Sequence, residues 1–144
     1  MKALTVRQPY GFALFHGKNV ENRRQMFTHR GLLLIHTGQH LAPASAFEFV
    51  NHLADAPLPV LGQPGEPTEC ALGSIIGAVQ VIGAHRVDAC GGTCSPWAER
   101  DAPAHLRIGQ PRVFRLPIPA FGRLGIWEIL DPQVEAAVQR ELDR

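Results

Sequence analysis

The stretch from Ser74 to Val87 (SIIGAVQVIGAHRV) is the part of the sequence that most restricts the fold. It is rich in β-branched residues, which favour strands, and it contains Gly77 and Gly83, which are unfavourable inside a helix. Glycine within a strand usually marks a bulge or a bend. The pattern therefore predicts one long, bent strand over 74–87, and a strand of this kind requires a curved sheet.

Several further segments have the alternation or the apolar runs of strands. The run from Gly31 to His36 is continuously apolar and too short for most helices, which predicts a central strand covered on both faces. Shorter strands are expected at residues 4–7, 20–23, 105–108, 113–118 and 125–130.

Helix signals are fewer and separate these strands. Pro9 opens a short helix that Gly17 ends, a second helix is expected over 43–54, and an amphipathic closing helix over 132–142. Residues 55–69 hold four prolines and two glycines and are expected to form a long surface loop. Together the elements predict an α+β, mainly β fold: a small closed or nearly closed β-barrel decorated by short helices.

Length and composition are those of a single folded domain spanning 1–144. The chain has 144 residues, of which 45% are hydrophobic and 19% charged, and this balance excludes an extended disordered protein. No run approaches the ~18 apolar residues of a membrane span, and the N-terminus lacks the apolar core of a signal peptide. The three cysteines are an odd number, which argues against a disulfide framework. We expect a cytoplasmic protein that makes no membrane contact.

The net charge of +1 conceals a segregation of charge along the chain. Residues 1–30 hold six cations and one acid, and residues 106–123 hold four arginines and no acid. If the fold brings these segments together, they form one positive face of the kind that binds phosphate or nucleic acid. Charges spread over a solvated surface are the alternative.

The first basic segment contains a compact set of polar residues at informative spacing. In an extended segment over residues 20–23, Glu21 and Arg23 lie on the same side because side chains alternate across a strand. Lys18 follows Gly17 at the end of the first helix, so the three charged side chains can converge. Such a lysine can contact phosphate or, if desolvated, act as an amine of lowered pKa. A surface ion-pair network without function is the alternative.

Three motifs in this order, RQPY at 7–10, GKxxExR at 17–23 and RGLLLIH at 30–36, resemble the ASCH domain (activating signal cointegrator homology). This family is a β-barrel related to the PUA RNA-binding fold. The segments 73–82 and 117–128, the latter reading PIPAFGRLGIWE, look like its second core strand pair and its closing strand. The resemblance covers about residues 3–130.

The resemblance implies a cleft lined by Lys18, Glu21 and Arg23 that accepts RNA, DNA or a nucleotide ligand. Some ASCH-like proteins are amidohydrolases of N4-acetylcytidine that use a lysine and a threonine nucleophile, and Glu21 stands where that threonine would be. Glu21 would then act as a general base with Lys18 and Arg23 holding an oxyanion. Other relatives are described as ribonucleases, in which Lys18 or Arg23 would stabilise phosphorane-like charge and His36 or Glu21 would move the proton.

If the protein is an enzyme, the candidate catalytic residues are thus Lys18 and Glu21. Tyr10 could stack on a base or pack in the core, Gln8 could read a base edge or cap the helix, and Trp97 could be an exposed stacking residue. His36 is either a cleft polar group or a core histidine bonded to backbone. The full set of expected ligand-binding residues is Arg7, Gln8, Pro9, Tyr10, Lys18, Glu21, Arg23, Arg30, His36 and Trp97.

A second set of residues, His85, Cys90 and Cys94, has spacings that could bind zinc. The fourth ligand is undetermined among Asp88, Cys70 and His105, so we assign no metal and no cofactor from the sequence. A third class of function, an adaptor that binds another protein through the acidic helix at 132–142, is supported only by the charge of the tail.

Overall fold

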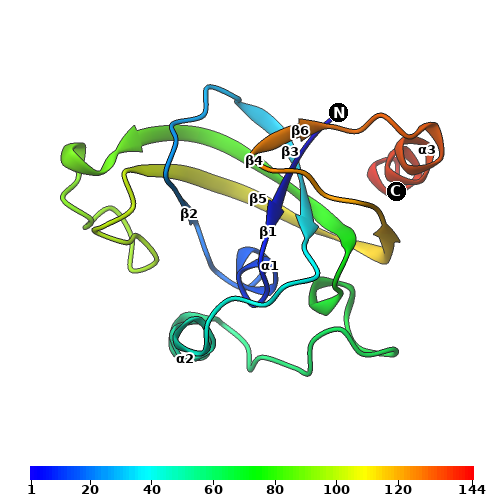
Figure 1. Cartoon of the computed structure of the whole chain (residues 1–144), viewed down its shortest axis with the longest axis horizontal. Coiled ribbons are helices and arrows are strands. Elements are labelled where there is room, and N and C mark those ends of the chain that lie inside the picture. The colour runs from blue at the N-terminus through cyan, green and yellow to red at the C-terminus, as the bar shows by residue number, and fades with distance from the viewer.

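A single curled sheet forms the body of the protein in a computed structural model that describes residues 1–144 (Figure 1). Its strands follow the order β2-β5-β4-β3-β1-β6. Only β1 and β3 pair in parallel. The strands are β1 (Lys2–Val6), β2 (Val20–Arg23), β3 (Gly31–Thr37), β4 (Ser74–Arg86), β5 (Ala104–Pro119) and β6 (Ile126–Glu128). The predicted α+β, mainly β class is confirmed.

Three short helices and two 3-10 turns decorate the sheet. They are α1 (Tyr10–Leu14), α2 (Ala44–Leu53), α3 (Pro132–Leu142), η1 (Thr68–Cys70) and η2 (Val87–Ala89). The prediction of a closing helix is confirmed at α3, where Asp131 accepts a hydrogen bond from the Gln133 N–H and so caps the first turn. No helix reaches the length and hydropathy needed to cross a bilayer.

The long strand β4 bends where its sequence predicts. Its pairing with β5 shifts register between Ile75 and Gly77, between Ala78 and Gln80, and between Val81 and Gly83. At Gly77 the backbone approaches β5 so closely that a Cβ atom would lie 2.4 Å from the Arg112 carbonyl oxygen. Glycine is therefore required there by contact with the neighbouring strand, and the bulges let the sheet curl.

The prediction of two separate strands at 105–108 and 113–118 is wrong, because both belong to the continuous strand β5. The intervening Gly109-Gln110-Pro111 has the composition of a turn. In the structure it is absorbed as an irregularity in which Gln110 adopts a positive φ of 49° while pairing with β4 continues on both sides. The long partner strand decides the outcome over local turn preference.

The curled sheet is a half-barrel whose two edge strands, β2 and β6, do not pair with each other. One apolar cluster, which includes Leu33, Ile76 and Leu106, fills the side of the sheet against α1. A second, which includes Trp127 and Val138, packs α3 against the other side. The curl brings the edge strand β2 toward β1, and the candidate site lies between them.

Candidate functional site

A cavity of about 760 Å³ opens between β1, the start of α1, β2 and the loops at 38–43 and 120–125. This volume is within the range of small-ligand sites. Its lining includes Glu21 and Arg23 from β2 and His36 from β3. Segments far apart in the sequence therefore supply one concave surface.

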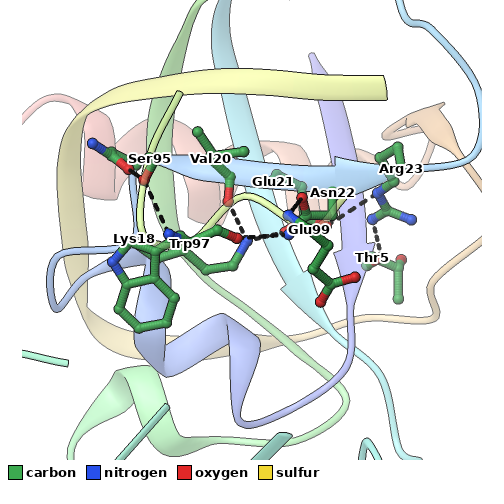
Figure 2. Close-up of polar contacts among 10 residues, drawn as sticks. Thr5, Lys18, Val20, Glu21, Asn22, Arg23, Ser95, Trp97 and Glu99 are labelled. Carbon is green, nitrogen blue, oxygen red and sulfur yellow. Dashed lines mark hydrogen bonds and ion pairs between the residues drawn. The ribbon is translucent and has the colours of Figure 1, made fainter. Parts of the chain in front are cut away.

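An ion network runs along β2 at the wall of this cavity (Figure 2). The Nζ of Lys18 lies 2.7 Å from Oε1 of Glu21, and the Nε of Arg23 lies 3.1 Å from Oε2 of the same carboxylate. The Arg23 Nη2 also donates to the Thr5 carbonyl oxygen at 2.9 Å, which links β2 to β1 across the open side of the half-barrel. The expected convergence of the amine, carboxylate and guanidinium is present.

Lys18 is placed differently from Glu21 and Arg23. Its side chain is only 1% exposed, and its ammonium also donates to the Val20 carbonyl oxygen. It lies behind the carboxylate, with its Nζ 5.6 Å from the centre of the Tyr10 ring, and does not line the cavity. Of the three charged residues, Glu21 and Arg23 face the cavity. Lys18 influences the cavity only through its ion pair with Glu21.

Two carboxyl groups in this region are shifted in opposite directions. Burial raises the pKa of Glu21, but the positive charges of Lys18 and Arg23 outweigh it, so its pKa is below the ordinary value. Glu99 has a raised pKa because of burial, with a further contribution from Asp101. Glu21 is thus an anion at neutral pH, held between two cations.

Three arginines surround the cavity: Arg7 after β1, Arg23 on β2 and Arg123 in the 120–125 loop. They come from both basic segments of the sequence, so part of the predicted positive face forms here. Arg112 is used elsewhere, because it donates to the carbonyl oxygens of Glu141, Leu142 and Arg144 at the end of α3. The cavity is cationic at its rim, which favours an anionic ligand.

Two aromatic rings lie at the same cavity. Tyr10 lines it from α1, where burial and then the charges of Glu99 and Glu21 raise the pKa of its hydroxyl. Phe121 lines it from the 120–125 loop and is 98% exposed. Phe121 is not among the residues predicted from the sequence, because the segment around it resembles a strand. Its position beside Gly122 and Arg123 in a Pro- and Gly-containing stretch was the available signal.

His36 is held by a hydrogen-bond chain beneath the 120–125 loop. Its Nε2 lies 2.7 Å from the Ala120 carbonyl oxygen, which can only accept, so this nitrogen carries the proton. The Trp127 indole donates to the Thr5 hydroxyl at 3.0 Å, and that hydroxyl donates to the His36 Nδ1 at 3.2 Å. Burial lowers the pKa of His36 below its ordinary value and so favours the neutral ring, although the hydrogen bond to Ala120 opposes this shift. Of its two expected roles, His36 combines cavity lining with a backbone-bonded core position.

Besides Lys18, four further expected ligand-binding residues do not face the cavity. Gln8 is fully buried; its amide donates to the Glu69 and Ala71 carbonyl oxygens and accepts from the Phe12 N–H, so it secures the start of α1. Pro9 is buried beside it. Trp97 is not an exposed stacking residue, because it is buried and packs edge-on against Phe49. Arg30 donates to the carbonyl oxygens of Phe27 and His29 outside the cavity.

Comparison with known proteins finds relatives in structure alone. No family model matches the chain, and no curated protein matches it. The crystal structure of ASCH from Zymomonas mobilis superposes with a TM-score of 0.59 at 13% identity, covering 96% of this chain and 93% of that one. A Tyr-to-Phe mutant of the Zymomonas mobilis ASCH protein superposes equally well, with 12% identity and 96% of each chain covered. The half-barrel with its three short helices thus has the fold of an ASCH protein.

Proposed function

We propose that the cavity binds single-stranded nucleic acid, RNA in particular, and takes one nucleobase with its flanking phosphates. The observation that carries this proposal is the meeting of three arginines and two aromatic rings around one cavity of about 760 Å³. Proteins bind single strands by combining a cationic surface for the backbone with aromatic rings on which bases stack. The resemblance to the ASCH and PUA families favours RNA.

Within the cavity each group has a distinct task. Arg7 and Arg123 form phosphate contacts at the rim, and Phe121 and Tyr10 offer ring faces to a base. Glu21 keeps Arg23 in place through the ion pair at 3.1 Å and presents acceptor oxygens to the amino group of a base. Specificity then comes from Glu21, and affinity from the arginines and rings.

Fluorescence anisotropy with a labelled single-stranded RNA tests this proposal, with DNA of the same sequence and a duplex as comparisons. Replacing Phe121 by alanine should weaken binding about 5- to 150-fold, the value of one base stack, without loss of stability since the ring is exposed. Log affinity should fall with log salt, with a slope that becomes shallower by about 0.7 in Arg123→Ala. Arg140→Ala on α3 removes the same charge outside the cavity lining and should change neither the affinity nor the salt slope. Absence of binding, or equal weakening by Arg140→Ala, contradicts the proposal.

Hydrolysis of a bound nucleoside or strand is the second candidate function. The specific observation for it is the Lys18–Glu21 pair at 2.7 Å, which places an ionised carboxylate beside a cationic cavity. For an N4-acyl cytidine, Glu21 would take a proton from water as the oxygen adds to the acyl carbon. The carbon–nitrogen bond then breaks, the proton passes to the departing amine, and Arg23 stabilises the oxyanion.

Incubation with N4-acetylcytidine and with labelled RNA separates the two functions. Deacetylation or strand cleavage that is lost in Glu21→Gln supports a hydrolase. Retention of RNA without turnover supports a binding protein. The activities of Glu21→Gln and the wild type must be compared at equal concentrations of folded protein, because Glu21 also supports the fold through its ion pairs.

A further inference from the structure

Four potential metal ligands lie outside the cavity, where β4 ends and β5 begins. The paired strands β4 and β5 are called the β4–β5 ribbon below. One nitrogen each from His85 and His105 and the sulfurs of Cys90 and Cys94 all lie within 4.8 Å of one another. His85 and His105 are direct cross-strand partners in β4 and β5, so their side chains lie on the same face of the sheet. The connection between the strands, residues 87–103, supplies both cysteines.

The distances match tetrahedral coordination. With zinc–sulfur bonds of about 2.3 Å and zinc–nitrogen bonds of about 2.0–2.1 Å, a tetrahedron has sulfur–nitrogen edges of about 3.6 Å. The His105 Nδ1 lies 3.4 Å from the Cys90 sulfur and 3.5 Å from the Cys94 sulfur. The two imidazole rings are nearly perpendicular, with their centres 5.4 Å apart. These positions already correspond to those around one ion.

The surroundings orient the ligands toward a common point. His105 donates through Nε2 to the Glu99 carbonyl oxygen at 2.8 Å, which leaves the Nδ1 lone pair directed at the two sulfurs. His85 has a buried Nε2 with no hydrogen-bond partner. The Gly92 N–H donates to the Cys90 sulfur at 3.4 Å, as backbone amides do toward metal-bound thiolates.

The turn between the cysteines is built on glycine. Gly91 and Gly92 have positive φ values of 61° and 79°, a conformation that L side chains rarely adopt. A Cβ on Gly92 would also lie 3.0 Å from the Cα of Arg100. The sequence Cys-Gly-Gly-Thr-Cys therefore folds back tightly enough to direct both sulfurs at the histidines.

We propose that His85, Cys90, Cys94 and His105 bind one zinc ion in a closed structural site. Two thiolates and two imidazoles form a donor set that suits zinc, and four protein ligands leave no open position for substrate. His105 is the fourth ligand that the sequence leaves undetermined. The alternative Cys70 is buried in a separate apolar cluster with α1 and α2, and Asp88 is not part of the group.

The ion would hold the 87–103 connection against the sheet, and that connection forms the support behind the candidate site (Figure 2). Ser95, directly after Cys94, donates to the Asn19 side chain. Asn22 of β2 donates to the Trp97 carbonyl oxygen at 3.0 Å and accepts from the Glu99 N–H at 2.9 Å. The segment from 95 to 99 thus braces β2 on either side of Glu21.

Metal analysis of the purified full-length chain tests this proposal. Elemental analysis should find zinc at about one ion per chain after gel filtration. Replacement by Co²⁺ should give the visible bands of a tetrahedral ion and a thiolate-to-cobalt charge-transfer band. Cys90→Ser and His105→Gln should each lower zinc affinity by more than the about 10- to 100-fold cost of second-sphere changes.

Two controls keep the outcome decisive. Cys70→Ala removes the third thiol, and His52→Gln removes an exposed histidine of α2; both variants should retain stoichiometric zinc. If the folded wild-type chain binds no zinc or cobalt when its thiols are reduced, the proposal is wrong. It is equally wrong if metal binds with the same affinity to Cys90→Ser, or if Co²⁺ shows octahedral spectra without charge transfer.

Discussion

Glu21 shows how a buried charge is maintained at the wall of a cavity. It lies between Lys18 and Arg23 and is itself only 9% exposed at the side chain, so its ionisation depends on both cations. Removing one member of such a buried pair leaves the other uncompensated, at a cost of about 3–5 kcal/mol. The network is therefore part of the fold as well as of the candidate site.

The pH dependence of stability follows from this arrangement. The pKa of Glu21 in the folded state is below its ordinary value of 4.5, so its contribution is fully present above that pH and is lost as pH falls through the folded-state pKa. Urea unfolding of wild type across the acid range should show this loss. Glu21→Gln should be less stable by about 3–5 kcal/mol at neutral pH and should show a weaker acid dependence. Parallel pH curves for the two proteins would contradict the assigned role.

Thr5 connects three elements through one residue. Its carbonyl oxygen accepts from Arg23, and its hydroxyl joins Trp127 to His36. Thr5→Val should lower the free energy of unfolding by about 1–3 kcal/mol, because it leaves the indole N–H and the imidazole nitrogen without a partner. Thermal denaturation measures this loss. Thr28→Val, at an exposed position, is the control and should be near neutral.

Residue-level roles were predicted where local geometry decides them. The pairing of Glu21 with Arg23 follows from strand alternation and is confirmed at 3.1 Å. The burial of Gln8 and Trp97 could not be predicted, because it depends on η1 and α2, which only the tertiary fold brings to them. The exposure of Phe121 could not be predicted for the same reason, because it follows from the path of the 120–125 loop.

At the scale of elements, the β4–β5 ribbon shapes the molecule. Its glycines permit the curl that brings β2 close to β1, and its far end supplies His85 and His105. The bent strand was predictable from β-branched residues interrupted by glycine, and the helices from proline starts and apolar spacing. The continuity of β5 could not be predicted from the sequence, because pairing along β4 overrides the local turn signal at Gln110.

Among the glycines of β4 and β5, Gly77 has the least room for a side chain. Gly77→Ala should lower the free energy of unfolding by about 1–3 kcal/mol, since the added Cβ would lie 2.4 Å from the Arg112 carbonyl oxygen and 2.7 Å from the Phe15 ring. Chemical denaturation of the two proteins measures the difference. Gly109→Ala in β5 is a matched control, because its Cβ would meet only Ile82 at 3.6 Å, an ordinary contact. Equal effects of the two substitutions would contradict the close approach at Gly77.

At the scale of the whole molecule, charge segregation and fold combine to make one cationic cavity. Arg7 and Arg23 come from the first basic segment and Arg123 from the second, although residues 31–105, which carry seven acids and only two arginines, lie between the two segments. The sequence indicated the segregation, but only the curl of the sheet decides which arginines meet. Arg112 belongs to the second basic segment as well, but its guanidinium donates to the Glu141 carbonyl oxygen at the end of α3 and does not line the cavity.

NMR chemical-shift mapping with a short single-stranded RNA shows whether the cavity is the surface that binds nucleic acid. If the cavity binds RNA, the perturbed amides will concentrate at Arg7, Tyr10, Glu21 and the 120–125 loop, and those of α3 will be unchanged. The perturbations should weaken as salt is raised. If RNA leaves these amide signals unmoved, or shifts those of residues on another face instead, the cavity is not the binding site.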